Sequence, residues 1–241
     1  MNLFNSIHLF IPGLRRRSCF VLATLLMAGN SRVSQASNPV VTKLHGRVTI
    51  SQSDRRFGEC VAISDRYLLV GEPRNSDVAS VAGAVHLYDA RTGRYLRKLT
   101  ASDGEADDRF GTSVSLEGDV AIIGAPGDGD LGFEAGAVYV FNVRTGTQLA
   151  KLTAADGTDS DWFGDSVSLS GNLALIGAPQ DDAAGNFSGS AYVFELLTGS
   201  QLVKLIGSNS QPFDEFGYSV SLSGNLALVG ARLGTGLSSE T

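Results

Sequence analysis

A Phe-Gly pair that recurs every 53 residues is the feature of this chain that most constrains its fold. The pairs are Phe57-Gly58, Phe110-Gly111, Phe163-Gly164 and Phe216-Gly217. Two further landmarks keep the same interval: Gly71-Glu72-Pro73, Gly124-Ala125-Pro126, Gly177-Ala178-Pro179 and Gly230-Ala231-Arg232, then Gly83-Ala84-Val85, Gly136-Ala137-Val138 and Gly189-Ser190-Ala191. Self-similarity at one fixed period predicts an array of one supersecondary unit. Residues shared by every unit are then expected to be structural, and function is expected where the units differ.

One unit, residues 110–153, contains four short apolar or alternating runs separated by turn residues. Alternation and β-branched or aromatic content predict strands at 110–116, 120–125, 137–141 and 148–152. Short turns join the first pair and the last pair of strands, whereas longer acidic loops follow the second and the fourth strand. Four antiparallel strands that end in a polar outer strand are typical of a propeller blade. A β-solenoid would need a shorter period, and a β-sandwich would not repeat in this way.

The predicted fold class is therefore all-β, a β-propeller of four-stranded antiparallel blades with about 53 residues per blade. The blades are expected at 57–100, 110–153 and 163–206, with a partial blade at 216–241. Residues 41–44 resemble an outer strand without its blade. This count predicts an incomplete or open ring, whose unpaired strand edges would favour self-association.

Residues 1–36 have the pattern of a secretory signal peptide. Arg15-Arg16-Arg17 precede an apolar run over 19–28, and Ser34-Gln35-Ala36 form a small-x-small cleavage site. The run is too short to span a bilayer, although an uncleaved anchor is the alternative. We expect a secreted, periplasmic or cell-surface protein whose mature chain, residues 37–241, has no membrane span.

Without this segment the chain keeps 25 acidic residues but loses four of its 19 basic ones. An excess of carboxylates argues against nucleic-acid binding and against an anionic membrane surface. Only Cys60 remains, so no intrachain disulfide is expected. Cys60 occupies the repeat position of Ser113, Ser166 and Ser219, which predicts a small buried side chain.

The landmarks resemble the FG-GAP repeats of the integrin α N-terminal propeller and of exported bacterial proteins. The resemblance rests on Phe-Gly, on Gly-Ala-Pro, and on Tyr139-Val140-Phe141 and Tyr192-Val193-Phe194. It implies a β-propeller that serves in cell adhesion or protein binding. The family's calcium loop, Asp-x-Asp-x-Asp-Gly, would lie between Phe-Gly and Gly-Ala-Pro, where this chain has only short turns. Calcium takes 6–8 oxygen ligands, so the resemblance carries no calcium site over.

Other loops do cluster carboxylates. The candidate metal ligands are Asp103, Asp107 and Asp108 before one Phe-Gly pair, and Asp156, Asp159 and Asp161 before the next. Asp108, Asp161 and Asp214 are repeat-equivalent, which favours a role in binding the loop's own backbone N–H groups. Solvated acidic loops and a calcium site are the alternatives. No cofactor is expected otherwise.

An enzyme is not expected. His45 and His86 are the only histidines after residue 36, and His86 occupies the position of Tyr139 and Tyr192. The sequence has no catalytic spacing of a nucleophile, a histidine and an acid, and it has no phosphate-binding loop. Paired carboxylates could hydrolyse glycosides, but here they recur at repeat-equivalent positions. A propeller hydrolase is thus a remote alternative.

Antiparallel topology places the loops at 51–56, 74–82, 101–109, 127–135, 154–162, 180–188 and 207–215 on one face. These loops hold sixteen of the 25 acids and four arginines. They also hold four aromatic residues without aromatic counterparts in other units: Trp162, Phe133, Phe187 and Phe213. Exposed aromatics among polar loops are typical anchors for a protein or glycan, unless they fold back as lids. We expect an extracellular binding or adhesion module, and the alternative is an architectural segment of a longer exported protein.

Overall fold

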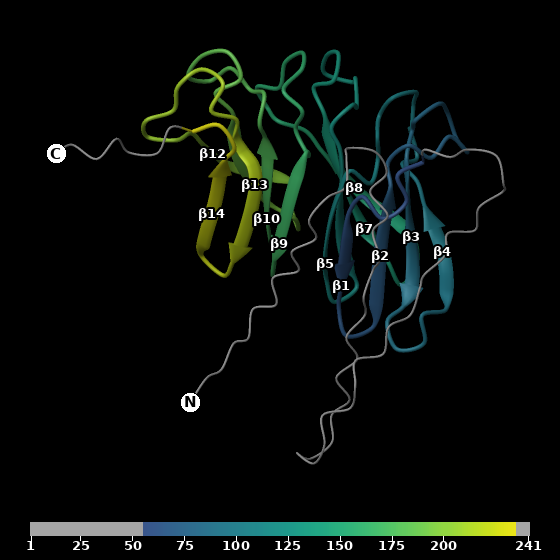
Figure 1. Cartoon of the computed structure of the whole chain (residues 1–241). Helices are drawn as coiled ribbons and strands as arrows, with labels where there is room; N and C mark the ends of the chain where they lie inside the picture. The colour runs from purple at the N-terminus through teal and green to yellow at the C-terminus, as the bar shows by residue number, and fades with distance from the viewer. Residues whose placement is uncertain (1–54, 235–241) are drawn as a thin grey trace, which may run out of the picture.

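The computed structural model describes residues 55–234, which form fourteen β-strands and no helix (Figure 1). The strands build three four-stranded antiparallel sheets and one two-stranded sheet. Each four-stranded sheet is a meander in chain order, as expected for propeller blades. The all-β prediction is confirmed, and the sheets of the described range do not close a ring. The signal-peptide prediction for residues 1–36 and the outer strand predicted at 41–44 lie outside the described residues.

The strand bounds follow the 53-residue repeat. The first blade contains β1 (Val61–Ile63), β2 (Tyr67–Glu72), β3 (Ala84–Asp89) and β4 (Tyr95–Leu99). The second contains β5 (Ser113–Glu117), β6 (Val120–Ala125), β7 (Ala137–Asn142) and β8 (Thr147–Leu152). The third contains β9 (Ser166–Ser170), β10 (Leu173–Ala178), β11 (Ser190–Glu195) and β12 (Ser200–Leu205). The two-stranded sheet consists of β13 (Phe216–Ser223) and β14 (Leu226–Ala231).

One boundary prediction was wrong. The alternating pattern predicted that the first strand of the second unit begins at Phe110, whereas β5 begins at Ser113. Phe110 and Gly111 instead form the centre of a turn in which the N–H of Thr112 donates to the carbonyl of Arg109, at 3.1 Å. Gly111 has a φ of 92°, a conformation that favours glycine. The Phe-Gly pair is therefore a turn that leads into the inner strand.

The inner strands β1, β5, β9 and β13 lie next to one another and join the blades. The hydroxyl of Ser113 donates to the carbonyl of Gly164 in the next blade, and Ser166 donates likewise to Gly217, both at 2.7 Å. Cys60 makes the equivalent contact with Gly111. The small polar face of each inner strand is thus the contact between blades, which explains why every unit repeats it.

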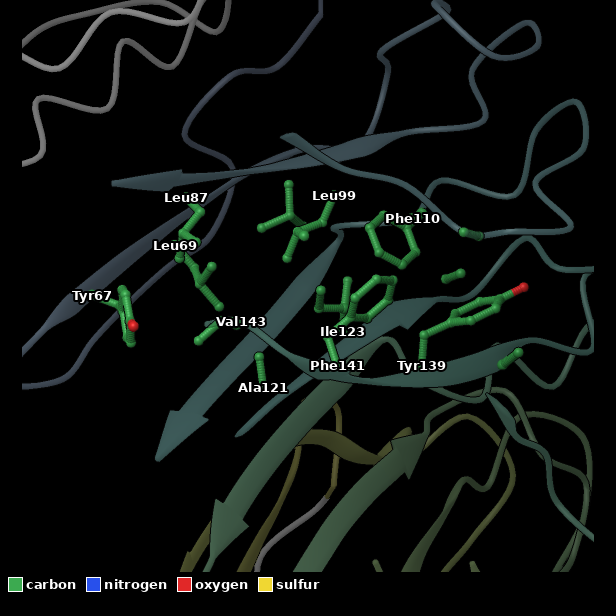
Figure 2. Close-up of a cluster of buried hydrophobic side chains, with 14 residues drawn as sticks. Tyr67, Leu69, Leu87, Leu99, Phe110, Ala121, Ile123, Tyr139, Phe141 and Val143 are labelled. Atoms are coloured by element: carbon green, nitrogen blue, oxygen red, sulfur yellow. The ribbon is translucent and has the colours of Figure 1, made fainter. Parts of the chain in front are cut away.

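The core lies between successive blades. Phe110 is fully buried and packs edge-on against Tyr139 and Phe141, with ring centroids 5.4 and 5.8 Å away. The surrounding cluster draws side chains from the first two blades, including Leu69 and Leu87 (Figure 2). Phe163 repeats the arrangement between the second and third blades. Phe110 and Phe163 therefore each fix one blade against its neighbour.

Within residues 55–234, no helix is long and apolar enough to cross a membrane.

Candidate functional site

The long loops lie at one end of the blades and the tight turns at the other (Figure 1). Each loop between a blade's second and third strands pairs with the loop that leads to the next blade. The N–H of Arg109 donates to the carbonyl of Val81 at 3.0 Å, and that of Trp162 donates to Glu134 at 3.2 Å. Backbone hydrogen bonds therefore fix the two loops of each pair against each other.

Three non-glycine residues in each loop pair adopt a left-handed backbone with φ between 52° and 72°. We call each set a loop triad: Val81, Asp107 and Arg109 form the first, Glu134, Ser160 and Trp162 the second, and Phe187, Phe213 and Glu215 the third. This conformation costs on the order of 1 kcal/mol for a non-glycine residue and more for a β-branched one such as Val81. The same backbone hydrogen bonds hold this left-handed conformation in all three loop pairs.

The loop triads differ in side chain while their surroundings stay constant. Repeat-equivalent positions hold Val81, Glu134 and Phe187, and another set holds Arg109, Trp162 and Glu215. The adjoining aspartate, the phenylalanine and the glycine that precedes the third strand recur in all three loop pairs. None of the nine triad side chains is buried. The scaffold thus presents variable side chains from a fixed backbone.

Trp162 occupies a polar cluster in the second loop triad. Its indole Nε1 donates to Glu134 Oε2 at 2.7 Å, and Glu134 also pairs with Arg109. The Arg109 guanidinium lies over the indole ring, 5.8 Å from its centroid. Trp162 is half-buried rather than fully exposed, so part of its surface stays available.

A second cluster contains Glu215, Arg232 and Tyr218. Arg232 pairs with Glu215 at 2.6 Å and lies over the Tyr218 ring at 4.5 Å. Arg232 stands where the other units have proline. The half-buried Asp165 interacts electrostatically with Arg109 of the first cluster and with Arg232 and Glu215 of the second. Burial raises the Asp165 pKa to about 6, against the opposing effect of the two arginines.

The remaining predicted anchors are phenylalanines that stay in solvent. Phe133 is 70% exposed, Phe213 54% and Phe187 38%. Phe187 and Phe213 pack edge to face, with ring centroids 5.8 Å apart. Carboxylates hold two of the backbones in place, because Asp159 accepts the N–H of Phe133 at 3.0 Å and Asp182 that of Phe187 at 2.7 Å. The exposed rings are therefore presented on ordered loops.

Lysines of the outer strands neutralise part of the acidic loop charge. Lys151 Nζ lies 2.8 Å from Asp128, 2.6 Å from Asp130 and 2.9 Å from Asp103, and Asp128 also accepts the hydroxyl of Tyr139. Lys204 repeats this contact with Asp156 and Asp181. Charge counting over loop residues alone missed these pairs because the lysines belong to strands.

The first blade keeps the lysine contact, as Lys98 with Asp77 at 2.7 Å, but has a buried His86 where the other blades have Tyr139 and Tyr192. His86 Nε2 lies 2.8 Å from Glu72 Oε2, which also accepts Asn75 Nδ2 at 2.6 Å. All three side chains are buried, and Phe57 packs edge-on against the imidazole. His86 therefore fills a strand position, as predicted.

Five of the six predicted metal ligands have other partners. Asp108 Oδ2 accepts the N–H of Glu105, and Asp161 Oδ2 accepts that of Thr158, both at 2.7 Å. Asp214 repeats the contact with Gln211, which confirms that this aspartate closes its own loop. Asp103 and Asp156 pair with lysines, Asp159 binds the Phe133 backbone, and Asp107 is exposed. The described part of the chain brings no three histidine, cysteine or acidic residues together as a metal site.

Comparison with known proteins identifies the repeat. The family model described as FG-GAP repeat matches residues 51–88, 95–141, 147–194 and 200–240. No curated protein matches the chain. Among solved structures, the computationally designed Ika8 protein is 19% identical with a TM-score of 0.48, over 72% of this chain. The alignment covers 42% of that designed protein, so the chain spans less than half of its length.

Proposed function

Because the chain belongs to the FG-GAP repeat family, we propose that it is a non-catalytic binding or adhesion module that recognises its partner through the loop face. We define the loop face as the three loop triads together with Phe133. The partner is an extracellular protein or glycan. The proposal takes from the family only a repeat module and takes the recognition surface from this chain's own residues, since one fold serves many functions.

The observation that carries the proposal is the variation of the loop triads on a constant backbone. Nine non-glycine residues keep a left-handed conformation, and their identities range over Val, Asp, Arg, Glu, Ser, Trp and Phe. A purely structural position in this conformation would favour glycine or asparagine. Strained positions that persist with changing side chains are typical of binding surfaces.

The proposed setting is outside the cytoplasm, by cleavage after residue 36 and export to the periplasm, cell surface or medium. The support is the sequence pattern of residues 1–36. The acid-rich composition supports a partner other than nucleic acid or an anionic membrane. Amino-terminal sequencing of exported protein tests this part, and a start at residue 1 would contradict it.

We further propose that binding needs no metal and involves no catalysis. The support is that Asp103 and Asp156 pair with lysines, whereas Asp108 and Asp161 bind backbone N–H groups. Melting temperatures in millimolar calcium and in chelator are expected to agree. A calcium-dependent rise would reassign these loops to calcium binding.

The alternative function is that of an architectural segment of a longer exported protein. Such a segment could also associate with further copies of itself. It is favoured by β14, where Leu226 and Leu228 are 77% and 73% exposed. Two neighbouring exposed leucines on one strand favour contact of β14 with a further polypeptide surface. A monomer that remains monomeric on concentration, measured by light scattering, would count against self-association.

The experiment for the main proposal screens the purified protein against a glycan array and a panel of extracellular matrix proteins. Trp162 is the only tryptophan of the chain, so its fluorescence reports binding at the loop face. The variant Phe133→Ala/Phe187→Ala/Phe213→Ala is expected to lose binding and to keep its melting temperature. The matched control is Leu197→Ala, since Leu197 is 86% exposed in a tight turn at the opposite end. Equal loss in the control, or no binding by the parent, overturns the proposal.

A further inference from the structure

We propose that this chain pairs head to tail with a second copy of itself and closes a ring of two copies. The exposed side of β13–β14, the trailing face, packs on the exposed side of the first blade of the other copy, the leading face. The trailing face contains Ser221, Leu226, Leu228 and Gly230, and the leading face contains Phe57, Gly58, Val61 and Ile63. Two copies supply twice the four sheets of one chain, within the about four to eight blades typical of a propeller.

The trailing face exposes apolar residues that are buried in the preceding blades. Leu226 and Leu228 of β14 are 77% and 73% exposed. The repeat equivalents of Leu228 are fully buried: Leu69, Ile122 and Leu175. Leu69 lies in the apolar cluster that the first blade shares with the second, so the blade that follows covers this position. Leu228 therefore has the side chain of an interface between blades.

Gly230 occupies a position where the other blades need glycine for contact with a following blade. In those blades a Cβ would overlap the carbonyl of the next Phe-Gly turn, at Gly71, Gly124 and Gly177. At Gly230 a Cβ would meet only the Ser219 side chain within the described residues, and the backbone lies outside the left-handed region that favours glycine. A second copy supplies the following Phe-Gly turn, Phe57-Gly58, and with it a reason for this glycine.

The leading face exposes the residues that other blades pack against their predecessor. Val61 and Ile63 of β1 are 51% and 56% exposed. The equivalent residues of the second blade pack against the cluster between the first two blades: Val114 and Leu116. Phe57 is half-buried, whereas its equivalent Phe110 is fully buried. A preceding blade would cover all three residues of the leading face.

Polar groups of the two faces continue a hydrogen-bond series between blades. The N–H of Leu222 in β13 donates to Ser168 Oγ in the preceding blade, at 2.9 Å. In the next step of the series, Ser221 of the trailing face takes the place of Ser168, and the N–H of Ile63 takes the place of the Leu222 N–H. Ser221 is exposed, so its hydroxyl is available to the second copy.

A second copy is the occupant that fits both faces at once. At each junction within the chain, a trailing side of one blade meets a leading side of the next, with the same repeat positions in contact. The two exposed faces are therefore complementary to each other. An unrelated protein, or another segment of this chain, would have to match one face and would leave the other uncovered. Head-to-tail contacts of this kind close into a ring where the rotation allows it.

The test is light scattering coupled to size-exclusion chromatography of the purified protein, from about 5 µM to about 200 µM. The parent is expected to reach the mass of two chains. Leu228→Glu on the trailing face and Ile63→Lys on the leading face are each expected to weaken association at least about tenfold. Leu197→Glu is the matched control, because Leu197 is 86% exposed in a tight turn, and its association should stay within about twofold of the parent.

Mixing the two variants distinguishes head-to-tail pairing from a face-to-face dimer. An equimolar mixture of Leu228→Glu and Ile63→Lys has one intact interface and one with opposite charges, so the mass of two chains is expected to return. A face-to-face dimer would gain no intact interface in this way. Gly230→Ala is the smallest variant, and it is also expected to weaken association at least about tenfold while the dilute monomer keeps its melting temperature.

Four results would overturn the pairing: a parent that stays monomeric at about 200 µM, a dimer unchanged by Leu228→Glu, equal loss in Leu197→Glu, and a mixture that stays monomeric. A Gly230→Ala monomer with a lowered melting temperature would also overturn it, since another segment of the same chain would then cover the trailing face. Each of these results leaves the binding function of the loop face standing, because that function has its own ligand screen and its own variants.

Discussion

The hydroxyl of Ser113 donates a 2.7 Å hydrogen bond to the backbone carbonyl of Gly164, which belongs to the next blade. This bond joins β5 to the Phe-Gly turn before β9, between residues that are 51 positions apart in the chain. Ser113 is buried, so the carbonyl would have no water to replace a lost donor.

Ser113→Ala is therefore expected to lower the free energy of unfolding by about 1–3 kcal/mol, because a buried acceptor loses its partner. The matched control is Ser219→Ala, since Ser219 is repeat-equivalent but exposed, and its cost should be below about 0.5 kcal/mol. Urea unfolding measures both. Equal costs would show that the inter-blade bond adds nothing.

Gly124→Ala is expected to prevent folding or to lower stability by more than about 3 kcal/mol. A Cβ at Gly124 would overlap the carbonyl of Gly164, which is backbone and cannot rotate away. Gly230→Ala is the control, because its Cβ would meet only the Ser219 hydroxyl. Melting curves by circular dichroism compare the two. A stable Gly124→Ala variant would contradict the close approach of the blades.

Lys151→Met is expected to cost about 3 kcal/mol, because it leaves the buried Asp128 beside Asp103 and Asp130 without a cation. Lys98→Met, whose partner Asp77 is exposed, should cost less than about 1 kcal/mol. Thermal unfolding near neutral pH checks the difference. Similar costs would show that Lys151 contributes no more than a surface ion pair.

Asp165→Asn is expected to stabilise the fold near pH 7.5 by at most about 3 kcal/mol. The Asp165 pKa is raised from 3.8 to about 6, so the folded state binds this proton more tightly than the unfolded state does. As pH falls from 7.5 through 6 toward 3.8, parent stability gains on the variant and the difference disappears. Melting temperatures of both proteins across this range give the result, and a difference independent of pH would exclude the carboxyl as its source.

Burial raises the pKa of the Cys60 thiol to about 12. Because the thiolate is the reactive form, labelling by a disulfide reagent at about pH 8 should be far slower than that of free cysteine. The measurement uses a Cys19→Ser background, and labelling in denaturant is the control. Rapid labelling of the folded protein would show that the position is open to solvent.

The repeat made the blades predictable, because Phe110 and Phe163, like Gly124 and Gly177, serve the same packing between successive blades. The candidate site was predictable only in part. Trp162 and the three phenylalanines stood out because other units lack them, whereas Asp165 and Arg232 did not. Their importance depends on contacts between neighbouring blades. The left-handed conformation of Val81 and Glu134 could not be predicted from residue type either. It is imposed by the hydrogen bonds between the paired loops, and neither residue is the glycine that usually marks this conformation.

The backbone pairing of the loops has a consequence for how such a protein changes over time. The hydrogen bonds that set each loop triad come from main-chain atoms, so they survive almost any substitution there. Nine surface positions are thus free to diverge after each duplication of the unit, while the blade that carries them keeps its shape. New side chains at these positions leave the main-chain hydrogen bonds of the blade in place, and a randomised library confined to the nine positions would sample new specificity directly.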